Sequence, residues 1–94
     1  MKSQKERNVQ RKLLLSLKKR GIFAVKIISA NLRGVADVMV IHNCRIIFIE
    51  LKANNNKQSI HQIKFAEICR ANNIEYWVVN ENNIDDVIRR IVSE

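Results

Sequence analysis

The hydrophobic positions along the chain follow two patterns, one that predicts helices and one that predicts strands. Apolar residues at three- and four-residue spacing predict helices over about residues 3–19, 59–71 and from 83 onward. Runs rich in β-branched residues predict strands over 22–28, 35–42, 45–52 and 75–79. The order helix, three strands, helix, strand, helix predicts an α/β fold with a mixed sheet and helices packed on its faces. The last strand follows a helix, so we expect it to run parallel to a neighbour.

The second and third predicted strands are expected to form a hairpin around the dipeptide Asn43-Cys44. In that register Met39 faces Phe48, and Asp37 faces Glu50. Two opposed carboxylates in a half-buried place repel each other, so either one binds a proton or a cation lies between them. A register shifted by one residue would instead put the two acids on opposite faces of the sheet.

Three more polar side chains are expected near this pair. Lys52 follows Glu50 by two residues and so shares its face of the strand. Glu6 lies on the same helical stripe as Leu13, which either carries it toward the sheet edge or leaves it solvated in a first turn. Gln62 lies on the apolar face of the second helix, where its amide either caps backbone groups or holds a polar ligand over the sheet.

Carboxylates, an amide and a lysine at one end of a sheet are typical of a site for a hard cation. Mg²⁺ or Mn²⁺ prefers oxygen ligands and keeps waters that leave room for phosphate oxygens. Lys52 would orient the attacking water or stabilise the charge that develops on the phosphate. Metal-dependent hydrolysis of a phosphodiester is the reaction that fits these residue types best.

Charge and composition favour the same chemistry. The 94 residues carry 17 Lys and Arg against 9 Asp and Glu, a net charge of +8, which suggests a nucleic-acid partner. Eight of those cations fall within the first twenty residues, so the first helix is expected to contact phosphates without reading sequence. We expect one domain over residues 1–94, because no proline- or glycine-rich linker divides the chain. Two cysteines and no long apolar run predict an intracellular, cytoplasmic protein without a membrane span.

Three motifs in this order resemble one nuclease family. They are Gly34-Val35-Ala36-Asp37, Ile49-Glu50-Leu51-Lys52 and Ser59-Ile60-His61-Gln62. Together they are similar to the virus-type replication-repair nuclease (VRR-NUC) domain of the PD-(D/E)xK superfamily, and the likeness spans nearly the whole chain. The resemblance implies a restriction-endonuclease-like mixed β-sheet flanked by helices. Ala36 stands where the family usually has proline, a change that affects only the stiffness of the turn into the strand.

The resemblance also implies roles for particular residues. Asp37 and Glu50 would be metal ligands, with the carbonyl of Leu51 as a further ligand, and Lys52 would be the catalytic lysine. Two more residues match positions of the family near the metal: its acid on the first helix and its helix glutamine, here Glu6 and Gln62. Stand-alone members are associated with cleavage of branched DNA as homodimers, in the manner of Holliday junction resolvases.

The function predicted from the sequence is therefore a Mg²⁺- or Mn²⁺-dependent, structure-selective DNA endonuclease acting on four-way junctions as a homodimer. Ile60 and Ile63 point away from the apolar stripe of their helix, and a two-fold interface would cover them. Two alternatives remain open at this stage. One is nicking or exonuclease activity on flaps or duplex, and the other is a non-catalytic DNA-binding module that keeps the fold.

Overall fold

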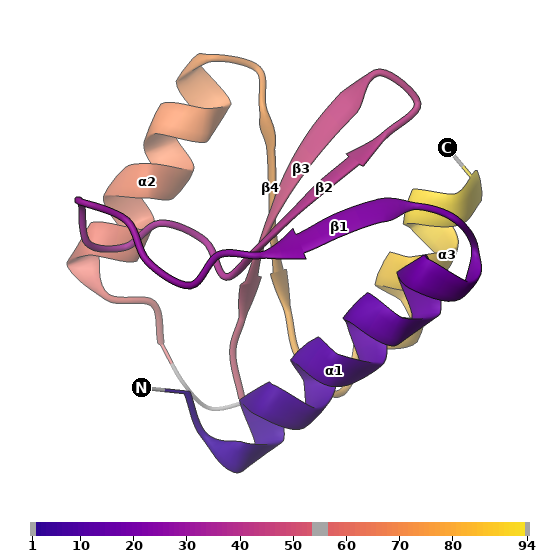
Figure 1. The fold of residues 1–94 in the computed structure, drawn as a ribbon. Coiled ribbons are helices and arrows are strands. Elements are labelled where there is room, and N and C mark those ends of the chain that lie inside the picture. The colour runs from indigo at the N-terminus through magenta and orange to yellow at the C-terminus, as the bar shows by residue number, and fades with distance from the viewer. Residues whose placement is uncertain (1, 54–56, 94) are drawn as a thin grey trace.

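The computed structural model describes residues 2–53 and 57–93, and its elements follow the predicted order (Figure 1). The helices are α1 (Gln4–Lys19), α2 (Ile60–Ala71) and α3 (Ile84–Ser93). The strands are β1 (Phe23–Lys26), β2 (Val38–His42), β3 (Arg45–Leu51) and β4 (Glu75–Val79). No helix among the described residues is both long and apolar enough to cross a membrane.

The four strands form a mixed sheet in the order β1-β2-β3-β4. β2 is antiparallel to both of its neighbours, β1 and β3, whereas β4 pairs with β3 in parallel, which confirms the predicted direction of the last strand. β3 is thus an inner strand, and side chains at its end are surrounded by structure on both sides. A functional group placed there is held more rigidly than one on an edge.

The hairpin between β2 and β3 has the predicted register. Asn43 and Cys44 form its two-residue turn with φ values of 52° and 61°, both left-handed as a type I′ turn requires. His42 pairs with Arg45, and the ladder continues to Val38 opposite Ile49. This register is the one that brings Asp37 beside the end of β3.

β1 and β2 are shorter than predicted, and residues 27–37 form a long connection between them. The amide of Ile27 donates to the carbonyl of Asp37 at 2.8 Å, which closes the connection at its base. Its far part packs on the start of α2, where a Cβ on Gly34 would lie 2.3 Å from the backbone carbon of His61. Because this contact replaces a sheet partner, the β-branched residues of the segment do not continue the strands.

Helices cover both faces of the sheet (Figure 1), with α1 and α3 on one face and α2 on the other. The core on the α1 and α3 face contains Leu13, Leu17, Ile47, Ile49 and Ile91, all fully buried. On the opposite face the ring of Phe48 packs edge-on against Phe65 of α2, with 5.1 Å between centroids. Glu50 follows Phe48 on that face, so a carboxylate occupies the next position of an apolar layer.

Candidate active site

Asp37 and Glu50 meet at the end of the hairpin, as the register predicts. Asp37 directly precedes β2, and its amide donates to the carbonyl of Ile49 at 3.0 Å. Its carboxylate Oδ2 accepts from the amide of Leu51 at 2.8 Å, which ties the aspartate to the last residue of β3. Glu50 is fully buried, whereas about a fifth of the Asp37 side chain is exposed. The pair therefore has one face toward the protein interior and one toward solvent.

The ammonium of Lys2 binds between the two carboxylates. Its Nζ lies 2.7 Å from Oδ2 of Asp37, 2.6 Å from Oε2 of Glu50 and 2.6 Å from the carbonyl oxygen of Leu51. A cation between opposed carboxylates was one of the two outcomes expected from the sequence, but Lys2 was not among the predicted site residues. A lysine directly before the capping serine of α1 was the only signal in the sequence that pointed to it.

The electrostatics of the site are dominated by the burial of Glu50. Burial and the neighbouring Asp37 raise the pKa of Glu50 to about 7, although the hydrogen bond from Lys2 acts in the opposite direction. For Lys2, burial lowers the pKa, and the contacts with both carboxylates together raise it above its ordinary value. Oε1 of Glu50 is buried and has no hydrogen-bond partner among the described residues. A buried carboxylate oxygen without a hydrogen-bond donor is suited to ligate a cation.

Gln62 caps backbone groups at the start of α2, which is one of the two roles expected from the sequence, and it also contacts Glu50. The side-chain Oε1 of Gln62 accepts from the backbone amide of Ser59 at 2.8 Å. The backbone amide of Gln62 donates to Oγ of Ser59 at 3.2 Å, which completes a capping box. Its Nε2 donates to Oε2 of Glu50 at 2.8 Å. The start of α2 is therefore joined directly to the buried carboxylate.

Glu6 has a similar double role at the start of α1. It is 4% exposed, with Oε1 accepting from the amide of Ser3 at 3.0 Å and Oε2 accepting from the amide of Ala53 at 2.7 Å. It thus fastens α1 to the chain just beyond β3. Within residues 2–53 and 57–93 there is no group of three or more His, Cys, Asp and Glu side chains placed to hold a metal. The expected meeting of three carboxylates is not found there.

Lys52 lies immediately beyond β3 and is partly buried. Its backbone amide donates to the carbonyl of Val79 at 2.9 Å, which extends the parallel pairing by one step. Within the part of the chain that the structure describes, its side chain makes no hydrogen bond or ion pair. The described residues therefore show no hydrogen bond or ion pair that joins the Lys52 side chain to Asp37 or Glu50.

The donor set fits a divalent metal ion. Two carboxylate oxygens and one carbonyl oxygen converge on a single cation, the Lys2 ammonium, which stands where a metal would bind. Oxygen donors from aspartate, glutamate and backbone carbonyls are those that Mg²⁺ and Mn²⁺ take. The residues present are therefore compatible with the metal that the resemblance implies.

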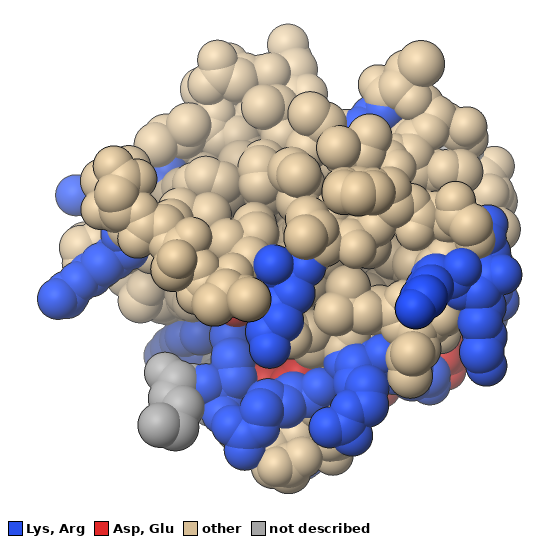
Figure 2. Space-filling model, viewed as in Figure 1, with Lys and Arg blue, Asp and Glu red and all other residues tan. Residues whose placement is uncertain are grey.

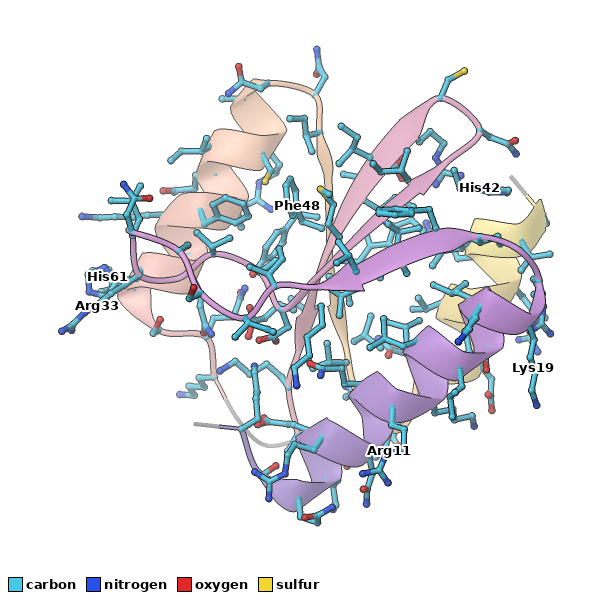
Figure 3. The ribbon with its side chains drawn as sticks, viewed as in Figure 1. Arg11, Lys19, Arg33, His42, Phe48 and His61 are labelled. Carbon is cyan, nitrogen blue, oxygen red and sulfur yellow. The ribbon has the colours of Figure 1, made fainter. Side chains whose placement is uncertain are left out.

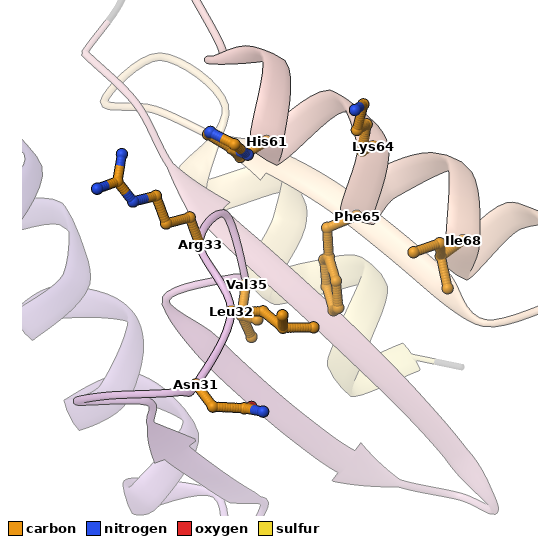
Figure 4. A pocket seen from close by; sticks show the side chains of 8 residues that line it. All are labelled: Asn31, Leu32, Arg33, Val35, His61, Lys64, Phe65 and Ile68. Carbon is orange, nitrogen blue, oxygen red and sulfur yellow. The ribbon is translucent and has the colours of Figure 1, made fainter.

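A groove of about 580 Å³ lies beside α2 (Figure 4). It lies between the connection of residues 27–37 and α2, with Leu32, Val35, Phe65 and Ile68 as its apolar lining. Arg33 and His61 stand together at one end of it in the close-up. Arg33 gives this end of the groove a positive charge.

Many cationic side chains are visible on the face drawn in Figure 2. Figure 2 shows Lys and Arg along the lower part of the surface, over α1, with little acidic surface between them. Arg11 and Lys19 mark this helix in Figure 3, and Arg33 lies beside His61 near the start of α2. The basic surface over α1 suits a phosphate backbone.

Comparison with known proteins supports the resemblance inferred from the motifs. One solved structure, described as a "VRR_NUC domain", superposes with a TM-score of 0.82 at 26% sequence identity, covering 93% of this chain and 97% of that one. No protein-family model and no curated protein matches the sequence. The order of elements, the mixed sheet and this close superposition over nearly the full length show that the chain has the fold of a VRR-NUC domain.

Proposed function

We propose that the chain is a Mg²⁺- or Mn²⁺-dependent, structure-selective DNA endonuclease that hydrolyses phosphodiester bonds in four-way junctions as a homodimer. The observation that carries the metal dependence is the convergence of Asp37, Glu50 and the carbonyl of Leu51 on one cation. Three oxygens directed at one point in a partly dehydrated place favour a charge of +2 more strongly than a charge of +1.

Asp37, Glu50 and Leu51 would hold the metal, which supplies a Lewis acid for the phosphate and lowers the pKa of a bound water. In the hydrolysis, the oxygen of a water bonds to phosphorus, one phosphorus–oxygen ester bond breaks, and the leaving oxygen gains a proton. Glu6 as a further ligand remains a prediction, and its two oxygens accept hydrogen bonds from the amides of Ser3 and Ala53.

Lys52 would act on the phosphate from the open side of the site. Its position just after β3, and the absence of side-chain partners in the described residues, leave its ammonium free to orient the attacking water or to stabilise the pentacovalent phosphorus. Gln62 is a positioning residue, because it acts through its hydrogen bond to Glu50.

The basic surface over α1 and the cations beside the groove support a DNA substrate that is recognised by its backbone (Figure 2). A homodimer would present two such sites and cut two strands of a junction symmetrically. The exposed side chains of Ile60 and Ile63 on α2, 66% and 43% accessible, support an interface on that helix.

The test incubates the purified protein with synthetic junction, flap, duplex and single-stranded DNA in Mn²⁺, Mg²⁺ or EDTA. We expect paired cuts in the junction that require metal. Lys52→Ala should reduce the cleavage rate by at least about 100-fold while leaving folding and DNA binding intact. Lys57→Ala, an exposed lysine five residues further along, is the matched control and should cleave at the rate of the unmodified protein.

Product patterns separate the proposal from its alternatives. Cleavage confined to flaps, or stepwise loss of terminal nucleotides, would replace the junction activity with nicking or exonuclease activity. DNA binding without cleavage in either metal would indicate a non-catalytic module. Equal rates for Lys52→Ala and Lys57→Ala would contradict the role given to Lys52.

A further inference from the structure

Lys2 uses its whole hydrogen-bonding capacity inside the candidate site. An ammonium has three N–H donors, and the structure gives Lys2 three acceptors within 2.7 Å: one oxygen each from Asp37, Glu50 and Leu51. The lysine side chain is 23% exposed, so its charge is largely withdrawn from solvent. Lys5, three residues later, makes one long ion pair with Glu81 at 3.4 Å and is 65% exposed. The contacts of Lys2 are therefore not a general property of the basic first helix.

The three acceptors of Lys2 are the same oxygens proposed above as metal ligands. Metal–oxygen distances for Mg²⁺ are about 2.0–2.1 Å. A metal within that distance of the same three oxygens would occupy nearly the space of the Lys2 nitrogen. The ammonium and the metal are thus mutually exclusive by geometry as well as by charge.

Lys2 is able to leave the site without unfolding its surroundings. Its own carbonyl accepts from Nη1 of Arg7 at 2.8 Å, and the next residue, Ser3, is the N-cap of α1. The backbone is therefore anchored independently of the side chain. Rotation about the side-chain bonds is enough to move the ammonium into solvent.

We propose that Lys2 is a built-in competitor for the divalent cation, so that it sets the metal affinity of the site. This inference rests on the proposed metal site. Lys2 balances the two carboxylates when it lies between them, and metal binding requires the lysine to swing out. A protein with this arrangement is stable without metal and binds metal more weakly than its ligand set alone would.

The test compares Mn²⁺ binding by calorimetry in the unmodified protein, Lys2→Met and Lys5→Met, all without DNA. Methionine has nearly the length of the lysine chain but no charge. We expect Lys2→Met to bind Mn²⁺ at least about tenfold more tightly, a difference of about 1.4 kcal/mol. Lys5→Met removes the same charge three residues further along, on the first turn of α1, and should change the affinity by less than about twofold, because exposed charges are screened.

Thermal melting gives a second, independent measurement. In EDTA, Lys2→Met should melt below the unmodified protein because two carboxylates lose their cation. In saturating Mn²⁺ the difference should disappear, since Lys2 is then displaced. Equal Mn²⁺ affinities for all three proteins, or weaker binding by Lys2→Met, would overturn the role of Lys2 and leave the proposed nuclease intact. No Mn²⁺ binding by any of the three would overturn the metal site itself.

Discussion

Glu50 is the residue with the most unusual surroundings in the molecule. Its carboxylate is fully buried at the end of an inner strand, next to the aromatic layer that Phe48 and Phe65 form. It is compensated by the Lys2 ammonium and the amide of Gln62, while Asp37 beside it adds a like charge. A buried carboxylate with a like-charged neighbour lowers the stability of the folded state, and such groups are typical of functional sites.

Glu50→Gln should therefore stabilise the protein in EDTA while removing its response to metal. The pKa of Glu50 in the folded chain, about 7, lies above its ordinary 4.5. Between these values the folded state holds a proton that the unfolded state has released, so stability falls as pH rises. At pH 8 the variant should gain on the order of 1 kcal/mol in free energy of unfolding. The gain should vanish well below pH 4.5, where both states are protonated.

Urea denaturation at several pH values measures this difference. The unmodified protein should also be stabilised by Mn²⁺, and the variant should not. A variant less stable than the unmodified protein at pH 8 in EDTA would mean that Lys2 and Gln62 fully compensate the buried charge.

For single residues, the sequence predicted which acids lie at the site but not all of their contacts. Strand alternation and a two-residue turn are local rules, and they were sufficient to place Asp37 opposite Glu50. Lys2 was missed because its contact joins residues 48 positions apart, and no periodic pattern marks it. Glu6 was correctly expected on the buried stripe, but its two backbone partners depend on where the chain runs after β3.

The connection between β1 and β2 is the element in which sequence pattern and structure differ most. Its β-branched and apolar residues extend the strand pattern at both ends, yet it leaves the sheet to pack on the start of α2. Gly34 makes this possible, because its φ of +86° and its lack of a Cβ allow it to touch the backbone of His61 and Gln62. Tertiary contact has overruled the strand propensity of this segment.

Gly34→Ala should therefore destabilise the protein far more than Gly21→Ala. A Cβ at Gly34 would lie 2.3–2.7 Å from three backbone atoms, and none of them belongs to a flexible side chain. We expect a loss of at least about 2 kcal/mol from overlap and strain. Gly21 has a similar φ of +71° but open space around it, so its substitution should cost about 1 kcal/mol.

Denaturant midpoints with unchanged slopes measure both losses. Similar losses for the two variants would show that the connection shifts away from α2 to make room. In that case Asp37, which ends the connection, should also be displaced, and metal-induced stabilisation should weaken.

The whole molecule presents two different surfaces to possible partners. One is the basic surface over α1 (Figure 2), and the other is the set of exposed isoleucines on α2. The net charge of +8 was enough to predict the first. The second was expected from two apolar sides on one helix, which the exposure of Ile60 and Ile63 confirms. How two copies would meet depends on shape complementarity, which a sequence pattern does not contain.

Light scattering at micromolar concentration tests the proposed dimer. The unmodified protein should have twice the 11.0 kDa of one chain. Ile63→Glu should give a single-chain mass with a change in stability below about 0.5 kcal/mol in the monomer, because the side chain is already solvent-accessible. Leu15→Glu, an exposed apolar position on α1, is the control and should stay dimeric. A single-chain mass for the unmodified protein would remove the basis for symmetric cleavage.

The glutamate and the glutamine of the two capping boxes each make a further hydrogen bond at the end of β3 or just beyond it. Glu6 closes the first turn of α1 and holds the amide of Ala53, while Gln62 closes the first turn of α2 and holds Glu50. Two helices from opposite faces of the sheet are thereby hydrogen-bonded to residues 50–53. We expect the first turns of both helices to open together with this segment, because each shares a contact with it. A substrate bound at the end of β3 would therefore contact a segment that both helices hold in place.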